Sequence, residues 1–334
     1  MATLQYILRR LLQAIPLLFG ISLLSFFLIN LAPGDFLAEQ RANPQVSNDF
    51  IRHLELQLGL VRPVIDDSTG EIALDPETGE EIYEDTPWWV QYGTWLWNIF
   101  RHGDFGYSFS TRQPVWTVIW SRLLNTLWLS VCALTFALVI ALPLGIWAAM
   151  RQYRWQDALG SFIAFVGLSM PDVFFALLML IFAKETGLLP LGGMRSVDFD
   201  ELSFGGKVLD LLHHVAAPAI VLGTARMAVY MRQMRGNLLD VLEADYVRTA
   251  RAKGLREGTV VVKHATRNAI NPIITLFGYS LSGLLSGSIL VENVMAWPGL
   301  GRTVVQALVA KDLYLVMAAV LMSSVLLIVG NLIA

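Results

Sequence analysis

Residues 123–150 read LLNTLWLSVCALTFALVIALPLGIWAAM, a stretch of 28 residues without a charged side chain. A transmembrane helix needs about 20 predominantly apolar residues to cross the hydrocarbon core of a bilayer. Uncharged runs recur at 11–34, 158–171, 268–291 and 313–334. The composition agrees, because 55% of the 334 residues are hydrophobic and only 15% are charged, whereas about 25% are charged in a typical soluble domain. These runs predict a protein that crosses the membrane several times.

Two spans reach the required length only if each includes one charged residue. The run at 158–183 then contains Asp172, and the run at 211–231 contains Arg226. Charges inside spans are costly and usually face the interior of a bundle or a water-filled cavity. The predicted fold class is therefore an all-α polytopic membrane protein with six transmembrane helices. The spans are expected within 1–33 and at about 123–150, 158–183, 211–231, 269–291 and 313–334.

Basic residues near the ends of the spans predict the orientation of the chain. They precede the first span, separate the second from the third, and separate the fourth from the fifth: Arg9 and Arg10, Arg151 and Arg154, and residues 232–267. Cytoplasmic loops are enriched in Lys and Arg. Six spans place all three segments on one side, so both termini are expected in the cytoplasm. The first apolar run is longer than the about 7–15 residues of a signal-peptide core, which favours an uncleaved span.

The region between the first two spans is acidic and is expected outside the cytoplasm. Residues 34–115 contain fourteen Asp or Glu and five Arg. Helical spacing at 50–60 predicts a short helix, and Thr-Gly pairs at 69–70 and 78–79 predict a hairpin or two short strands. Those pairs lie in the most acidic segment, residues 66–85. This segment is either a solvated surface or a docking patch for a partner or a cationic substrate.

Tryptophans cluster ahead of the second span, at Trp88, Trp89, Trp95, Trp97, Trp116 and Trp120. Tryptophan favours the membrane–water interface, where its ring is buried while its N–H remains hydrated. The cluster therefore predicts a helix that lies on the outer membrane surface. A stacking site for aromatic groups of a ligand is the alternative.

The basic loop 232–268 contains a short candidate helix. Residues 243–254 read EADYVRTARAKG, an amphipathic pattern followed by glycine where a helix commonly ends. A surface helix held between two spans is suited to transmit movement from a soluble partner.

The fifth predicted span is rich in small residues. Gly278, Ser282 and Ser286 recur every four residues, and Gly283 and Gly287 form a GxxxG pattern. Small residues allow helices in lipid to approach closely. They could instead line a permeation path, because they leave room and offer hydroxyl groups.

Motifs for catalysis or metal binding are absent from the sequence. It contains no GxxxxGK[ST] phosphate loop, no HExxH zinc motif and no GxSxG nucleophile elbow. We therefore expect no enzymatic activity, no metal site and no cofactor in this chain. The basic loop is explained by the orientation of the spans, so nucleic-acid binding is not expected.

Four blocks of sequence together resemble one family. They are YILRRLL at 6–12 with PGD at 33–35, GDFGYS at 103–108, DYVRTARAKGL at 245–255, and VE at 291–292 with WPGLGR at 297–302. The chain resembles a type I ABC-importer permease subunit, namely the first, or B-type, permease of the dipeptide/oligopeptide/nickel family. The likeness spans nearly the whole chain.

The resemblance implies a permease module at 116–334 with a cytoplasmic coupling loop at 232–268. In that family a coupling helix, here 243–258, fits a groove of the ATPase. The implied ATPase-coupling residues are Glu243, Asp245, Tyr246, Arg248, Thr249, Ala250, Lys253 and Gly254. Arg248 occupies the position of the acid in the family's EAA pattern, and Arg267 that of its closing proline. The candidate pathway-lining residues are Asp172, Ser282, Ser286 and Glu292.

The resemblance also implies a multi-pass protein of the bacterial inner (cytoplasmic) membrane that works in a complex. Its expected partners are a homologous second permease, two ABC ATPase subunits that bind ATP and Mg²⁺, a periplasmic substrate-binding protein and the lipid bilayer. Di- or oligopeptides are the expected substrates, with nickel, glutathione or another small solute as alternatives. An ion-coupled secondary transporter that uses Asp172 is a more distant alternative, as is a membrane scaffold. The sequence ends within an apolar run at Ala334, where the family usually adds a short polar tail.

Overall fold

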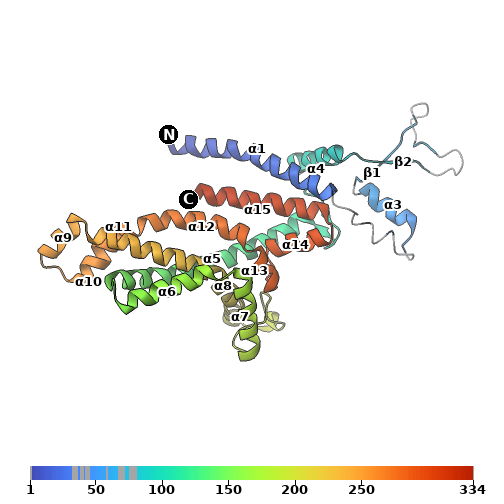
Figure 1. The fold of residues 1–334 in the computed structure, drawn as a ribbon. Coiled ribbons are helices and arrows are strands. Elements are labelled where there is room, and N and C mark those ends of the chain that lie inside the picture. Colours follow the sequence, from blue (N-terminus) through green and yellow to red (C-terminus); the bar gives the residue numbers. More distant parts are fainter. Residues whose placement is uncertain are drawn as a thin grey trace. The chain divides into compact units, whose positions relative to one another are not determined.

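The computed structural model describes residues 2–31, 37, 41, 46–57, 59–66, 72–74 and 81–333. These parts are mostly helical (Figure 1). The chain divides into two compact units. The bundle unit comprises Met1–Ala14, Trp120–Val305 and Met322–Ala334, and the insertion unit comprises Ile15–Ile119 and Gln306–Leu321.

The bundle unit is built from helices of very different lengths. In chain order they are α5 (Val115–Met150), α6 (Trp155–Ser169), α7 (Asp172–Thr186), η1 (Phe199–Glu201), α8 (Phe204–Leu242), α9 (Asp245–Ala252), α10 (Glu257–Thr259), the π-helix η2 (Val260–Ala265), α11 (Thr266–Ala269), α12 (Asn271–Gly287) and α13 (Ile289–Val294). Helices α1 (Ala2–Leu31), α14 (Leu300–Val309) and α15 (Leu313–Ile333) have residues in both units, and the first residues of α5, up to Ile119, belong to the insertion unit.

Within the described residues, four helices are long and apolar enough to cross a membrane. They are Leu8–Leu31, Val115–Met150, Phe204–Leu242 and Leu313–Leu332. The prediction of a helical chain with several membrane-length helices is confirmed. The predicted span at 269–291 corresponds to the shorter helix α12 followed by α13.

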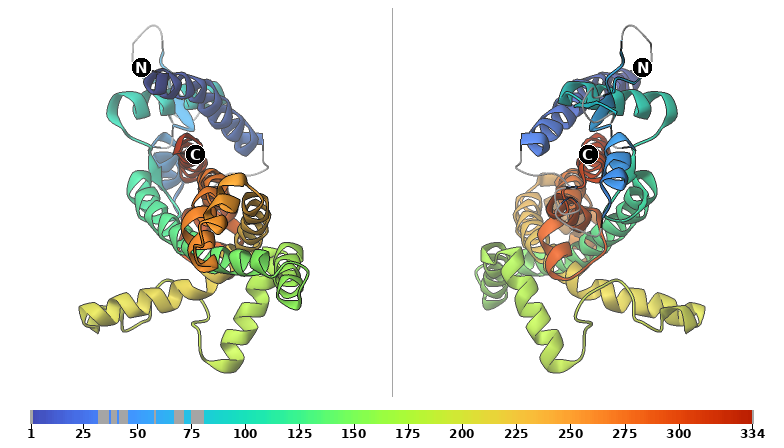
Figure 2. Two further views of the ribbon diagram at one scale, coloured as in Figure 1. Left: turned by 90° about the vertical axis from the view of Figure 1, so that its left-hand side faces the viewer. Right: turned by 90° about the vertical axis from the view of Figure 1, so that its right-hand side faces the viewer.

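The predicted span at 158–183 is not one straight helix. Helices α6 and α7 meet at an angle of 103°. The break falls at Met170 and Pro171, because proline lacks an N–H and its ring disfavours the helical conformation of the preceding residue. Met170 is accordingly extended, with φ −87° and ψ 119°. A new helix begins at Asp172. Figure 2 shows α7, in light green, and the first part of α8, in yellow, projecting as two diverging arms.

The helices of the bundle unit approach closely through small residues. A Cβ atom added to Gly160 on α6 would lie 2.4 Å from Cε of Met231 on α8, and one added to Gly145 on α5 would lie 2.8 Å from the Met231 carbonyl oxygen. An ion pair also joins α6 to α8: Arg235 Nε lies 2.5 Å from Asp157 Oδ1, and Arg235 Nη2 lies 2.7 Å from Asp157 Oδ2. Close packing and one buried carboxylate therefore fix α8 at the centre of the unit.

The insertion unit contains the helix and the strands expected from its sequence. Helix α3 (Asn48–Gln57) confirms the predicted helix at 50–60. Strands β1 (Val61–Pro63) and β2 (Tyr83–Asp85) pair antiparallel, and the isolated antiparallel bridges Ile65–Ile72 and Leu74–Glu81 join residues 72–74 to the residues beside both strands. The ladder confirms the predicted hairpin, although it begins ahead of the acidic segment. The two Thr-Gly pairs and PGD at 33–35 lie outside the described residues.

Four of the six clustered tryptophans lie on helix α4 (Trp88–His102), which has one buried face, and Trp116 and Trp120 lie on α5. Tyr92 and Trp95 pack with Phe26 and Met317, whereas Trp89 and Trp97 are exposed. The indole N–H of Trp95 donates to the Phe105 carbonyl oxygen at 3.2 Å. The helix is thus confirmed, while its position at the membrane surface stays a prediction. A second hairpin, β3 (Tyr107–Ser108) with β4 (Gln113–Pro114), follows α4.

Candidate functional site

Helix α9 forms one end of the bundle unit together with α10 and η2 (Figure 1). It is shorter than the helix predicted at 243–258, so those bounds are wrong. Glu243 instead ends α8, and the chain leaves the helical conformation after Ala252. Gly254 has φ +76°, the left-handed conformation that glycine adopts at helix ends. A separate short helix then begins at Glu257.

The two faces of α9 differ in burial and in chemistry. Val247 and Ala250 are buried and belong to the hydrophobic core of the bundle unit, together with Val260 and Val261 of η2. The opposite face exposes Asp245, Arg248, Thr249 and Ala252. These four positions follow i, i+3, i+4 and i+7 spacing, which places them along one side of a helix. Three of the four side chains are polar or charged, so the exposed side, called here the polar stripe, is available to a partner.

A set of polar contacts holds α9 on its neighbours. Arg251 Nη2 donates to Glu257 Oε1 at 2.7 Å, Arg251 Nε donates to Glu257 Oε2 at 3.2 Å, and Arg251 Nη1 donates to the Leu242 carbonyl at 3.4 Å. The side chain thus connects the ends of α8 and α9 with the start of α10. Asn268 Nδ2 donates to the Tyr246 hydroxyl at 2.8 Å, which ties α9 to α11. These contacts link α9 to three neighbouring elements, α8, α10 and α11.

Arg251 and Glu257 also alter each other's acidity. Hydrogen bonds from Arg251 and its positive charge hold the pKa of the Glu257 carboxyl below its ordinary value. The Glu257 carboxylate in turn raises the pKa of the Arg251 guanidinium. Sequence reasoning missed this pair and the Asn268–Tyr246 bond. Their partners lie six and 22 residues apart, and only the return of the chain after Gly254 brings them together.

The predicted coupling residues do not share one environment. Arg248, Thr249, Asp245 and the partly covered Tyr246 are exposed on α9, while Lys253 and Gly254 are exposed in the turn that follows. Ala250, by contrast, is only 8% exposed and faces its own subunit. It positions the helix rather than contributing to the exposed stripe.

The pathway candidate Glu292 lies at the centre of a buried hydrogen-bond network. Its side chain is completely buried. Oε1 accepts from the hydroxyls of Thr126 and Ser288, each at 2.8 Å, and Oε2 accepts from the backbone N–H of Arg302 at 3.0 Å. The Thr126 hydroxyl also accepts from the Leu300 N–H at 2.8 Å. The carboxylate therefore accepts from donors on α5, at the N-cap of α13 and in the first turn of α14.

This network fixes the WPGLG segment at 297–301 to α5. Trp297 is completely buried, and its indole N–H donates to the Asn125 carbonyl at 3.1 Å. Asn125 Nδ2 donates to the Pro298 carbonyl at 2.8 Å. In this conformation Glu292 faces the protein interior, and its role in lining a pathway stays a prediction.

The other three pathway candidates lie on two other helices. Asp172 is half-buried at the start of α7, close enough to Arg226 of α8 for their charges to interact. Ser282 and Ser286 lie on α12, where the side chains of residues 281–287 are outside the described set. Their lining roles stay predictions.

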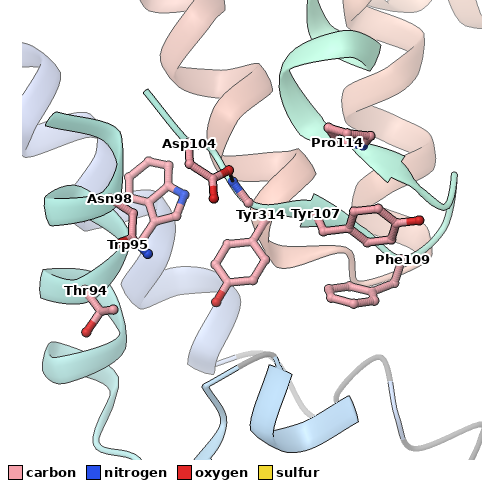
Figure 3. Close-up of a pocket in the computed structure, with 9 residues that line it drawn as sticks. Thr94, Trp95, Asn98, Asp104, Tyr107, Phe109, Pro114 and Tyr314 are labelled. Carbon is pink, nitrogen blue, oxygen red and sulfur yellow. Dashed lines mark hydrogen bonds between the residues drawn. The ribbon is translucent and has the colours of Figure 1, made fainter. Parts of the chain in front are cut away.

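The insertion unit contains a cavity of about 390 Å³ beside the second hairpin (Figure 3). It is lined by α4, by the hairpin and its approach, and by the start of α15, through Thr94, Trp95, Asn98, Asp104, Gly106, Tyr107, Phe109, Pro114 and Tyr314. Sequence reasoning did not find it, because its walls come from segments about 200 residues apart.

The hairpin is anchored beside this cavity by a buried aspartate. Oδ2 of Asp312 accepts from the Ser108 hydroxyl at 2.7 Å and from the hydroxyl and N–H of Ser110 at 2.8 and 3.0 Å. Oδ1 accepts from the Leu315 N–H at 3.2 Å and so caps α15. The same carboxylate thus positions the hairpin and the helix that carries Tyr314.

Known proteins with similar sequences share one kind of function. Residues 141–334 match the family described as binding-protein-dependent transport system inner membrane component. The chain is 38% identical over 331 residues to an oligopeptide transport system permease protein of Bacillus subtilis, covering 98% of this chain and 95% of that protein. It is 34% identical over 346 residues to a dipeptide transport system permease protein of Escherichia coli, with coverages of 98% and 95%. It is 37% identical over 331 residues to a glutathione transport system permease protein of Salmonella typhimurium, with coverages of 99% and 95%.

Proposed function

Because the chain belongs to the binding-protein-dependent transport system inner membrane components, we propose that it is a permease subunit of an ATP-driven importer of di- and oligopeptides. Relatives named for oligopeptide, dipeptide and glutathione transport, each similar over nearly the full length, support a peptide substrate. Glutathione is itself a tripeptide and falls within this class. Nickel is an alternative substrate within the wider family, but none of these three relatives is named for nickel transport.

The subunit takes up the energy of ATP hydrolysis through α9. The observation that carries this proposal is the division of α9 into a buried apolar face and an exposed polar stripe, Asp245, Arg248, Thr249 and Ala252. Two ABC ATPase subunits hold ATP and Mg²⁺, and the permease itself is non-catalytic. Closure of the ATPase dimer pushes on the stripe, and the contacts of Arg251 and Tyr246 pass the movement to α8, α10 and α11.

The proposed topology has six spans and cytoplasmic termini, in the bacterial inner membrane. Residues 34–115 then lie on the periplasmic side, where a substrate-binding protein delivers the peptide. A homologous second permease completes the translocation pathway within the module at 116–334. Helix α9 and the basic residues of the loop 232–268 lie on the cytoplasmic side, which agrees with the enrichment of Lys and Arg in cytoplasmic loops.

Site-directed cross-linking tests the orientation of α9 against the ATPase. In a Cys132→Ser background, Thr249→Cys places a thiol on the exposed stripe, and Ala250→Cys is the matched control on the buried face one residue away. Thr249→Cys should cross-link to a co-purified ATPase subunit, whereas Ala250→Cys should not. The reconstituted complex should take up a labelled dipeptide only with ATP. Uptake that needs an ion gradient and proceeds without ATP would overturn the proposal in favour of a secondary transporter.

A further inference from the structure

The cavity beside the second hairpin has the lining of a site for an organic cation. Four aromatic side chains, Trp95, Tyr107, Phe109 and Tyr314, surround it, and Asp104 is the one charged residue among the described residues that line it. The face of an aromatic ring attracts a cation. Cavities that bind small molecules measure about 300–1,000 Å³, and this cavity of about 390 Å³ is large enough for a dipeptide-sized group.

Asp104 is placed to receive the cation. Figure 3 shows its carboxylate between Trp95 and Tyr314. Oδ1 accepts from the Gly106 N–H at 2.9 Å, which orients the carboxylate, and the residue is exposed. Its charge lies near enough to Tyr314 to interact with the phenol. Thr94 and Asn98 add side-chain oxygens along the same wall.

The walls of the cavity are held in place before any ligand arrives. Gly106 has φ +93°, and a Cβ there would lie 3.0 Å from Cγ of Tyr314, so the ring packs directly against the backbone. Trp95 is tied to Phe105 by its indole N–H, and the buried Asp312 fixes the hairpin to the helix of Tyr314. A preformed site loses little conformational entropy on binding.

The lining chemistry favours a primary ammonium group over a metal ion. A hard divalent cation takes six or more oxygen ligands with several carboxylates, whereas this cavity offers one carboxylate among aromatic rings. An ammonium group has three N–H donors, which suit one carboxylate and nearby neutral oxygens. We infer that this cavity binds the protonated α-amino group of the transported peptide on its way into the permease. The inference rests on the proposed function, since it takes the peptide as the substrate.

Equilibrium binding to the full chain in lipid nanodiscs tests the inference without the ATPase. The probes are radiolabelled dialanine and N-acetyl-dialanine, which lacks the positive charge. Asp104→Asn keeps an oxygen for the Gly106 N–H while removing the carboxylate charge. Asp85→Asn, an exposed carboxylate of the same unit outside the cavity, is the matched control. Tyr107→Leu removes one exposed ring without altering the charge.

Dialanine should bind the wild type and Asp85→Asn alike and N-acetyl-dialanine more weakly. Asp104→Asn should weaken dialanine binding about tenfold, as loss of a hydrogen bond to a charged group does, and Tyr107→Leu should weaken it less. Equal binding of both probes, or unchanged binding to Asp104→Asn, overturns the inference. The inference is also overturned if Asp104→Asn weakens only the binding of the substrate-binding protein and not the binding of dialanine.

ATP-dependent dipeptide uptake by the complex is scored separately. If uptake persists without Asp104-dependent binding, only the inference fails, and if no peptide is taken up the proposed function fails.

Discussion

Gly299 packs so closely against Glu292 that a Cβ on the glycine would lie 2.4 Å from the carboxylate carbon. Glu292 accepts three hydrogen bonds in a completely buried position, so its carboxylate cannot move aside without losing them. The WPGLG segment therefore depends on a missing side chain at Gly299 and on the hydrogen-bonding carboxyl group of Glu292. A side chain at position 299 would displace the Glu292 carboxyl group, and a residue without this carboxyl group at position 292 would leave the three donors without their acceptor.

Gly299→Ala should destabilise the protein by about 1–3 kcal/mol, the usual cost of forcing an extra carbon into a packed site. The added methyl group would displace the Glu292 carboxylate and leave buried donors without an acceptor. Thermal unfolding of the detergent-solubilised protein measures the effect. Gly236→Ala on α8 is the matched control, because a Cβ there meets no atom within 4 Å. Equal unfolding temperatures for the two variants would contradict the packing argument.

The sequence was sufficient to predict the long helices, the helix and hairpin between the first two long helices, and the presence of a short loop helix. Apolar runs, basic loops and glycine at a helix end are local signals, and the structure has helices where most of those signals lie. The bend at Pro171 could also have been read from the sequence. A proline inside an apolar run is a local cause of a helix break, but the prediction of one span at 158–183 placed no break at Pro171.

The roles of single residues at the sites could not be predicted in the same way. Glu292 is one of the candidates for lining the pathway, and nothing in the sequence indicates the buried hydrogen-bond network in which it lies. Its three donors come from Thr126, Ser288 and Arg302, and only the folded chain brings Thr126 to it. The same reason hid the cavity of Figure 3, whose Tyr314 lies about 200 residues after its other walls. Periodicity reveals the face of a helix but not what packs against it.

Asp157→Asn should destabilise the bundle unit by about 3 kcal/mol, because it leaves the partly buried Arg235 without its counter-charge. Asp157 is only 6% exposed, and its carboxylate also accepts from the Tyr153 N–H. Denaturant or thermal unfolding gives the difference. Arg62→Gln is the control, since its pair with Glu84 is about half exposed on both sides and should contribute under about 1 kcal/mol.

A double variant provides a second check of this ion pair. Asp157→Leu combined with Arg235→Met should recover much of the stability lost in either single variant, because two apolar side chains need no charge compensation. If the double variant is as unstable as the sum of the two single variants, the residues do not act as a pair.

Gly254→Ala should weaken coupling without crowding any neighbour. A Cβ at Gly254 meets no atom within 4 Å, but its φ of +76° costs a residue with a Cβ about 1–2 kcal/mol. The strain would favour other conformations of the turn and loosen the Arg251–Glu257 connection. Dipeptide uptake per ATP hydrolysed is the measurement, and it should fall. Gly258→Ala is the control, because that position is also open but lies within α10 at an ordinary φ. An unchanged ratio in Gly254→Ala would show that the turn has no part in transmission.

The stability of α9 against local unfolding should depend on pH, because the Glu257 carboxyl titrates. The pKa of this carboxyl is lowered in the folded protein from an ordinary value of 4.5, so the ionised form stabilises the fold. That stabilisation is fully present above the unfolded pKa and is lost as the pH falls through the lower, folded pKa. The raised pKa of Arg251 leaves its charge unchanged over this range.

Amide hydrogen exchange at 245–257, corrected for the intrinsic pH dependence of exchange, should therefore show protection decreasing as the medium is acidified below about pH 4.5. In Glu257→Gln the protection should be low at neutral pH and should change little on acidification, since the titrating group is gone. A wild-type profile that matches that of Glu257→Gln throughout would mean that the Arg251–Glu257 pair does not stabilise α9.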